Sequence, residues 1–206
     1  MSAVNVIRKS DSVHLICDGQ VYTRTGAPAF QMTKILEFPN LNAAIAMRGN
    51  ILLLSTVLLV VMGAGASFDE VRRKLPDALR KAFEEAKGEC EKHSDAPVEI
   101  ELAMGGFRND GSSDSFLIHS HQVHSAGSPW KVIDTPIATA PGTPEIIQEF
   151  QSKSPDAMNP EAFDPVRHGL ILLEAQRARE SRIGAFAQLT SVHRDRIETR
   201  ILRRWN

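Results

Sequence analysis

The segment Ile51–Met62, ILLLSTVLLVVM, constrains the fold more than any other feature, because it is apolar on nearly every side. Its twelve residues fall well short of the roughly 20 that a helix needs to cross a bilayer. A helix with this pattern is expected to be buried between a sheet and a neighbouring helix or subunit. The segment therefore predicts a layered fold and excludes a membrane span.

A second helix is predicted directly after the Gly63–Gly65 break. Ser67 is a suitable N-cap, and Glu70 follows three residues later, as in a capping box. The helix would run over Phe68–His93 with a charged face, and Pro76 predicts a kink or a restart inside it.

Alternating segments typical of strands precede and follow this helical pair. The predicted strands before it are Val4–Ile7, Val13–Cys17, Tyr22–Thr25 and Ala43–Met47. Those after it are residues 98–107, 115–124 and Trp130–Ala140, and an Asn-Asp-Gly turn separates the first two. Two more helices, Gly142–Phe150 and Pro165–Arg179, and terminal strands complete the order. This order predicts an α+β fold, a four-layer αββα sandwich.

Composition limits the organisation and the partners of the chain. With 206 residues, of which 42% are hydrophobic, it can bury a full core, so residues 1–206 are interpreted as a single domain. A net charge of −1 argues against nucleic-acid binding. Cys17 and Cys90 form no CxxC motif, and the N-terminus shows no secretory signal. We therefore expect a cytoplasmic protein without a nucleic-acid or membrane partner.

Ser2 becomes the first residue of the chain if Met1 is removed, and the small Ala3 favours that removal. A free N-terminal serine carries a hydroxyl nucleophile and an α-amine on one residue. The amine, with an unperturbed pKa of about 7.7–8.0, can act as a base near neutral pH. This is the chemistry of an N-terminal-nucleophile hydrolase.

Three further residues follow Ser2 at regular intervals: Asp18, Lys34 and Gly49 are spaced by sixteen, sixteen and fifteen residues. An ammonium at Lys34 would lower the pKa of the hydroxyl and of the amine, and Asp18 would hold that ammonium in place. The backbone N–H of Gly49, where the chain enters the apolar helix, could stabilise an oxyanion. Taken singly, each residue also suits a start residue, a turn or a surface lysine.

The first fifty residues, from SAVNVIRKSDSVHLICDGQ to AIAMRGN, resemble the catalytic β-subunits of the proteasome and the bacterial HslV peptidase. Ser2, Asp18, Lys34 and Gly49 match the nucleophile, aspartate, lysine and oxyanion glycine of that family, with Ser in place of Thr. The resemblance implies the αββα fold, no cofactor or metal, and assembly into stacked rings that enclose the nucleophiles. It also implies unfolded polypeptide as the substrate and a separate ATP-driven unfoldase, since the chain carries no P-loop.

The same resemblance implies supporting residues in the second half of the chain. Thr143, beside Gly142, stands where the family has a serine that supports the nucleophile, and the Ala126–Pro129 turn is the second choice. Arg179-Glu180 keeps the family's Arg-Asp pair with a longer carboxylate, Ile183 replaces a serine of the turn that follows, and Gly184 keeps one of its glycines. Both Thr143 and Glu180 also suit ordinary turn and helix-end positions. The residues that would line the substrate pocket are Val21, Met32 and Ala46.

Other interpretations stay open at this point. His119, His121 and His124 have a spacing that a zinc site could use, although histidines on the polar face of a hairpin are commoner and no carboxylate or cysteine cluster accompanies them. The fold could belong to a catalytically silent scaffold subunit or to an amidase acting on a small amide. The helices Ile51–Met62 and Phe68–His93 are the candidate contacts between subunits.

Overall fold

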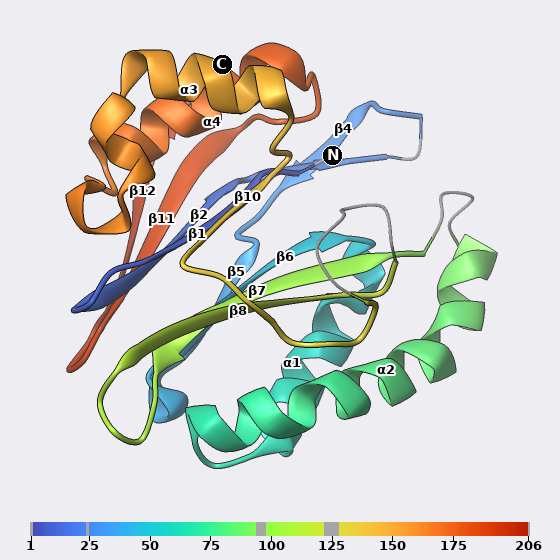
Figure 1. The fold of residues 1–206 in the computed structure, drawn as a ribbon. Helices are drawn as coiled ribbons and strands as arrows, with labels where there is room; N and C mark the ends of the chain where they lie inside the picture. The colour runs from blue at the N-terminus through green and yellow to red at the C-terminus, as the bar shows by residue number, and fades with distance from the viewer. Residues whose placement is uncertain (1, 24, 94–97, 122–127, 206) are drawn as a thin grey trace.

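Two five-stranded sheets lie face to face, and a pair of helices covers the outer face of each (Figure 1). The computed structural model describes residues 2–23, 25–93, 98–121 and 128–205. The predicted order of helices and strands is confirmed at this level: the chain is an α+β, four-layer αββα sandwich.

The first sheet has the strand order β10-β1-β2-β11-β12, and all its neighbours are antiparallel. Helices α3 and α4 cover it through a core that includes Ile16, Phe150 and Leu173. The bounds are β1 (Val4–Arg8), β2 (Ser12–Asp18), β10 (Ile137–Ala140), α3 (Pro144–Lys153), α4 (Arg167–Arg179), β11 (Phe186–His193) and β12 (Ile197–Arg204).

The second sheet has the order β5-β6-β7-β8-β9, and helices α1 and α2 pack on it around residues such as Phe68, Leu75 and Phe116. A separate hairpin, β3 (Gln20–Tyr22) with β4 (Pro28–Gln31), precedes it. The bounds are β5 (Ile35–Phe38), β6 (Ala43–Gly49), α1 (Leu54–Ala64), α2 (Phe68–His93), β7 (Ile100–Phe107), β8 (Ser113–His119) and β9 (Ile133–Asp134).

Apolar side chains from the facing sides of the two sheets fill the layer between them. Val6, Leu15 and Cys17 of the first sheet pack with Ala46 and Ala103 of the second, and all five are fully buried. Asp18 directly follows Cys17 and is the last residue of β2.

Helix α2 has the predicted bounds, and its first turn explains why. The Ser67 hydroxyl accepts a hydrogen bond from Glu70 N at 3.3 Å, and the Glu70 carboxylate accepts one from Ala66 N at 2.9 Å. The helix is continuous from Phe68 to His93, so it does not restart at Pro76, and the kink stays a prediction. A stripe of buried apolar side chains anchors it on both sides of the proline: Val71, Leu75, Leu79 and Phe83.

Three other predictions need correction. The strand expected at Tyr22–Thr25 ends at Tyr22, where the β3–β4 hairpin begins to turn. The single strand expected at Trp130–Ala140 is two short strands in different sheets, because β9 pairs with β8 and β10 pairs with β1. This segment therefore crosses from one sheet to the other.

The third correction concerns the apolar segment Ile51–Met62. A 3-10 turn at Ile51–Leu53, capped by Asn50, precedes α1, and the helix continues to Ala64. Only one side of α1 is buried, whereas Leu59 and Met62 are 69% and 64% exposed. No helix in the described part of the chain is long and apolar enough to cross a membrane.

Candidate active site

Lys34 is the centre of the candidate site, and the start of β5 holds it in place. Its carbonyl accepts a hydrogen bond from Met47 N at 3.0 Å, and the next residue, Ile35, pairs with Ala46 of β6. The side chain is only 4% exposed. A buried lysine must direct its ammonium to acceptors, because an unpaired buried charge is costly.

The Lys34 ammonium donates three hydrogen bonds, which is its full capacity. Its acceptors are the Ser2 hydroxyl at 2.9 Å, the Asp18 carboxylate at 2.8 Å and the Gln20 carbonyl at 2.7 Å. These contacts join the start of β1, the end of β2 and the first residue of β3 at one nitrogen. The ammonium therefore has one orientation, directed at the Ser2 oxygen.

Asp18 is fully buried and anchors the backbone around the site. One carboxylate oxygen accepts hydrogen bonds from Ala3 N and Lys34 Nζ, both at 2.8 Å. The other accepts from Gln20 N at 3.1 Å and from Gly184 N at 3.3 Å. The bond to Ala3 fixes the residue next to Ser2, so the carboxylate positions the hydroxyl as well as the lysine.

Burial changes the acid–base properties of this region. Desolvation lowers the pKa of the Lys34 ammonium below its ordinary value, although the charge of Asp18 opposes the shift. Desolvation also raises the pKa of the Cys17 thiol, beside Asp18, well above its ordinary value. Cys17 is therefore a neutral core side chain.

Gly49 ends β6 two residues after Met47, at the same end of the sheet as Lys34. Its φ of +118° lies in a region that only glycine adopts readily, and a Cβ here would lie 2.2 Å from the Glu99 carbonyl oxygen. The exposed glycine leads directly into the capped turn at Ile51–Leu53.

No protein-family model matches the sequence, and no curated protein sequence matches it either. Solved structures do match it. The similarity to a Gly-1 mutant of Anbu from Hyphomicrobium sp. strain MC1 has a TM-score of 0.72 at 10% identity, and covers 98% of this chain and 87% of that one. Anbu from Yersinia bercovieri, described as an ancestral beta-subunit, gives 0.70 at 11% identity, with 97% and 86% covered. The chain has the Anbu fold.

A third Anbu structure, the helical assembly of the Anbu complex from Pseudomonas aeruginosa, gives a TM-score of 0.71 at 14% identity. It covers 97% of this chain and 86% of that one. The three matches extend over nearly the whole chain, so the proteasome-like fold that the sequence resemblance implies is confirmed at the level of architecture. Identities this low establish the fold and leave the role of each residue to the site itself.

Within the Anbu fold of this chain, Thr143 and Glu180 cap helices. The exposed Thr143 accepts a hydrogen bond from Ile146 N at 3.4 Å and begins α3. Glu180 ends α4, and its backbone N donates to the Gln176 carbonyl at 2.8 Å. Among the described residues, no hydrogen bond joins either side chain to Ser2, Asp18 or Lys34, so their catalytic roles stay predictions. The second choice, the Ala126–Pro129 turn, lies partly outside the described residues.

The loop after α4 reaches the site through a different residue, Gly184, whose N–H donates to Asp18. The resemblance pointed to Gly184 as a retained glycine but not to this contact, and the sequence analysis missed the Gln20 carbonyl altogether. Both act through the backbone, so no side-chain pattern could identify them. Gly19, between Asp18 and Gln20, has no room for a side chain, because a Cβ there would lie 2.2 Å from the Phe186 ring.

The three predicted pocket residues differ in exposure. Ala46 is fully buried in the core opposite Ile35, and Val21 of β3 is 9% exposed. Met32 is half-buried, and its N–H donates to the Gly19 carbonyl at 2.9 Å. The substrate pocket stays a prediction.

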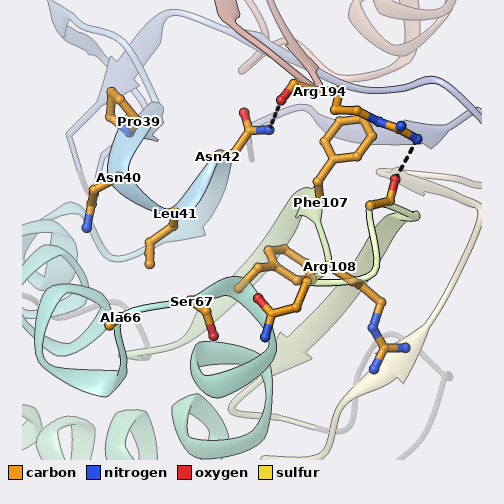
Figure 2. Close-up of a pocket in the computed structure, with 12 residues that line it drawn as sticks. Pro39, Asn40, Leu41, Asn42, Ala66, Ser67, Phe107, Arg108 and Arg194 are labelled. Carbon is orange, nitrogen blue, oxygen red and sulfur yellow. Dashed lines mark hydrogen bonds between the residues drawn. The ribbon is translucent and has the colours of Figure 1, made fainter.

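A surface pocket of about 330 Å³ lies beyond the end of β5, whereas Lys34 precedes the start of that strand (Figure 2). It is lined by the turn after β5, the start of α2, the β7–β8 turn and Arg194 of the β11–β12 turn. Asn42 donates to the Arg194 carbonyl at 2.8 Å, and the Arg194 guanidinium donates to the Gly111 carbonyl at 2.9 Å. None of the predicted site residues lines it.

His119 ends β8 and His121 follows it, and no group of three or more side chains that could hold a metal ion occurs among the described residues. The buried His119 ring lies 6.0 Å from the His121 ring, and His121 is 3.7 Å from the Glu99 carboxylate. His124 lies outside the described residues.

Proposed function

We propose that this protein is an N-terminal-nucleophile peptidase that cleaves peptide bonds of unfolded polypeptide, with Ser2 as the nucleophile after loss of Met1. One observation carries the proposal: the buried Lys34 ammonium contacts the Ser2 hydroxyl oxygen at 2.9 Å and the Asp18 carboxylate at 2.8 Å. A buried ammonium directed at an N-terminal hydroxyl has an electrostatic use in nucleophilic catalysis. In a purely structural role, two well-packed apolar side chains in place of the Lys34–Asp18 pair would be as stable.

In the first half of the reaction, the Ser2 oxygen attacks the substrate carbonyl while its proton passes to the Ser2 α-amine. Negative charge then develops on the former carbonyl oxygen, and the Gly49 backbone N–H is the proposed donor that stabilises it. Collapse of this intermediate breaks the C–N bond, and the leaving amine takes the proton from the α-ammonium. The product is an ester on Ser2.

In the second half, a water molecule attacks the ester carbonyl, and the α-amine accepts a proton from it. The carboxylic acid product leaves, and the proton returns to the Ser2 oxygen. Lys34 supports both halves because its positive charge favours negative charge on the Ser2 oxygen and the neutral form of the α-amine. Asp18 holds Lys34 through this sequence, and Thr143 and Glu180 are proposed as outer supporting residues.

We also propose that the protein acts as an assembly of many copies, by analogy with the helical assembly of the Anbu complex from Pseudomonas aeruginosa. The exposed apolar face of α1, formed by Leu58, Leu59 and Met62 and extended by Leu52 of the preceding turn, is a candidate contact between copies. An enclosed assembly would admit only unfolded chains to the Ser2 sites, and a separate ATP-driven unfoldase would supply those chains.

The test is hydrolysis of a set of fluorogenic peptides and of an unfolded protein by the purified assembly. Ser2→Ala should abolish cleavage, Ser2→Thr should retain it, and the control Ser152→Ala, on the exposed face of α3, should leave it unchanged. Cleavage that survives Ser2→Ala would refute the assignment of the nucleophile.

The exposed apolar face of α1 also favours a second candidate, a catalytically silent scaffold with the same fold. It predicts full assembly and no hydrolysis of any peptide by the mature protein. Hydrolysis of small amides alone, dependent on Ser2, would instead identify an amidase.

A further inference from the structure

Strand β12 is an exposed edge of the first sheet. It pairs with β11 on one side and lies last in the strand order of the described residues. Glu198, Thr199, Arg200 and Ile201 are all exposed. An edge strand of this length presents unpaired backbone groups to which another strand can add.

The register of the β11–β12 hairpin shows which backbone groups point outward. His193 N donates to the Arg196 carbonyl at 2.8 Å, so these two residues form a hydrogen-bonded pair. Hydrogen-bonded and non-hydrogen-bonded pairs alternate along an antiparallel ladder. Glu198 and Arg200 therefore bond to β11, whereas the N–H and C=O groups of the alternate residues point away from the sheet: Ile197, Thr199 and Ile201.

The side chains of this strand are complementary to a second, antiparallel copy of the same strand. With Thr199 opposite the partner's Thr199, Ile197 lies opposite the partner's Ile201, and Glu198 lies opposite the partner's Arg200. Each acid thus meets a base, and each isoleucine meets an isoleucine. The positions also agree with the backbone, because Ile197, Thr199 and Ile201 are the residues with outward N–H and C=O groups.

The geometry points to a two-fold contact in which β12 of one copy pairs with β12 of another, centred on Thr199. The contact joins two five-stranded sheets into one continuous sheet, and it is isologous, so it closes a pair of copies without extending further. The partner is a second copy and not a foreign peptide, since the sequence Ile-Glu-Thr-Arg-Ile pairs each charge with its opposite when it runs against itself. The inference rests on self-association and is independent of catalysis by Ser2.

The pair Glu198 and Arg200 occupies a non-hydrogen-bonded position of the proposed ladder, where facing side chains are closest. Reversal of one charge places like charges opposite each other twice in the symmetric contact. We expect Glu198→Arg and Arg200→Glu each to raise the dissociation constant of this contact at least about ten-fold. Neither substitution should unfold the chain, because both side chains are exposed.

The decisive experiment mixes the two variants. In a mixed pair, the new arginine of one copy faces Arg200→Glu of the other, and the remaining Arg200 faces the remaining Glu198. Sedimentation velocity and native mass spectrometry should show that each variant alone loses the two-fold contact and that the mixture restores it as a mixed pair. Association unchanged in the single variants, or no recovery in the mixture, would overturn the inference.

A second measurement works in assemblies of any size. Thr199→Cys places two thiols at the two-fold axis, and hydrogen-bonded pairs have Cα atoms about 5.5 Å apart, within disulfide range. Cys17 and Cys90 are buried and do not compete. Oxidation should cross-link Thr199→Cys into a dimer and leave Ser152→Cys monomeric on a non-reducing gel, and this result should persist in a Ser2→Ala background. Equal or absent cross-linking in the two variants would overturn the contact.

Discussion

Replacement of Lys34 by methionine should destabilise the protein strongly, because it leaves the Asp18 carboxylate buried without its counter-charge. Lys34 and Asp18 side chains are 4% and 0% exposed, and their charged atoms are 2.8 Å apart. Breaking a buried ion pair by removal of one partner costs about 3–5 kcal/mol. Three backbone N–H groups, from Ala3, Gln20 and Gly184, still contact Asp18. We therefore expect a loss near the lower limit, about 3 kcal/mol, or roughly 6–12 °C in melting temperature for a chain of this size.

A matched control separates burial from distance. Lys153 and Glu149 on α3 form an ion pair with the same 2.8 Å separation, but their side chains are 53% and 22% exposed. Lys153→Met should therefore cost less than about 0.5 kcal/mol. Urea denaturation at pH 7 measures both losses in the free energy of unfolding. Equal losses in the two variants would show that burial of the Lys34–Asp18 pair does not have the energetic role assigned to it.

Further predictions concern Gly49, His14, Leu59 and the pH dependence of hydrolysis. Gly49→Ala should lower the free energy of unfolding by at least about 1–3 kcal/mol, because its φ is +118° and the added Cβ meets a carbonyl; thermal unfolding measures this loss. Burial, together with the charge of Lys9, lowers the pKa of His14 from 6.5 to about 4. The free energy of unfolding is therefore unaffected by His14 above pH 6.5. It falls by up to about 3 kcal/mol as the pH decreases toward the folded-state pKa, because the unfolded chain binds a proton that the folded chain does not. A urea stability series that is flat over this range, or that is unchanged by His14→Gln, would contradict this. Leu59→Lys should weaken assembly in sedimentation experiments but change the free energy of unfolding by less than about 0.5 kcal/mol, because Leu59 is largely exposed. The rate of hydrolysis should rise with pH as the α-amine loses its proton and fall when the Lys34 ammonium loses its own, below the ordinary lysine pKa; a rate that keeps rising beyond that pKa would exclude a role for the ammonium.

Elements with local signals could be predicted from the sequence. Helix α2 has a capping serine at Ser67, an acid at Glu70 and an apolar stripe, and all three lie within a few turns of one another. The segment Trp130–Ala140 lacks such a signal for its change of sheet. Its two halves pair with β8 and β1, which are distant in the sequence, and propensity gives no information on such partners.

The candidate site divides in a similar way. The grouping of Ser2, Asp18 and Lys34 could be expected from the resemblance of the first fifty residues, and the folded chain does bring the three side chains into contact. The Gln20 carbonyl and the Gly184 N–H could not, since every residue has these groups and only the folded chain selects two of them. The sequence left open which surface covers α1, because an apolar segment suits burial within one chain and burial between chains equally well.

The most direct test of the central claim is the intact mass of the purified protein before and after treatment with a peptide epoxyketone. This electrophile reacts with a hydroxyl and a free α-amine on the same residue. The account predicts loss of Met1 and a single covalent adduct that is absent in Ser2→Ala and present in the control Ser152→Ala. A chain that retains Met1, or a mature chain that forms no adduct, would contradict the claim that Ser2 is a catalytic nucleophile.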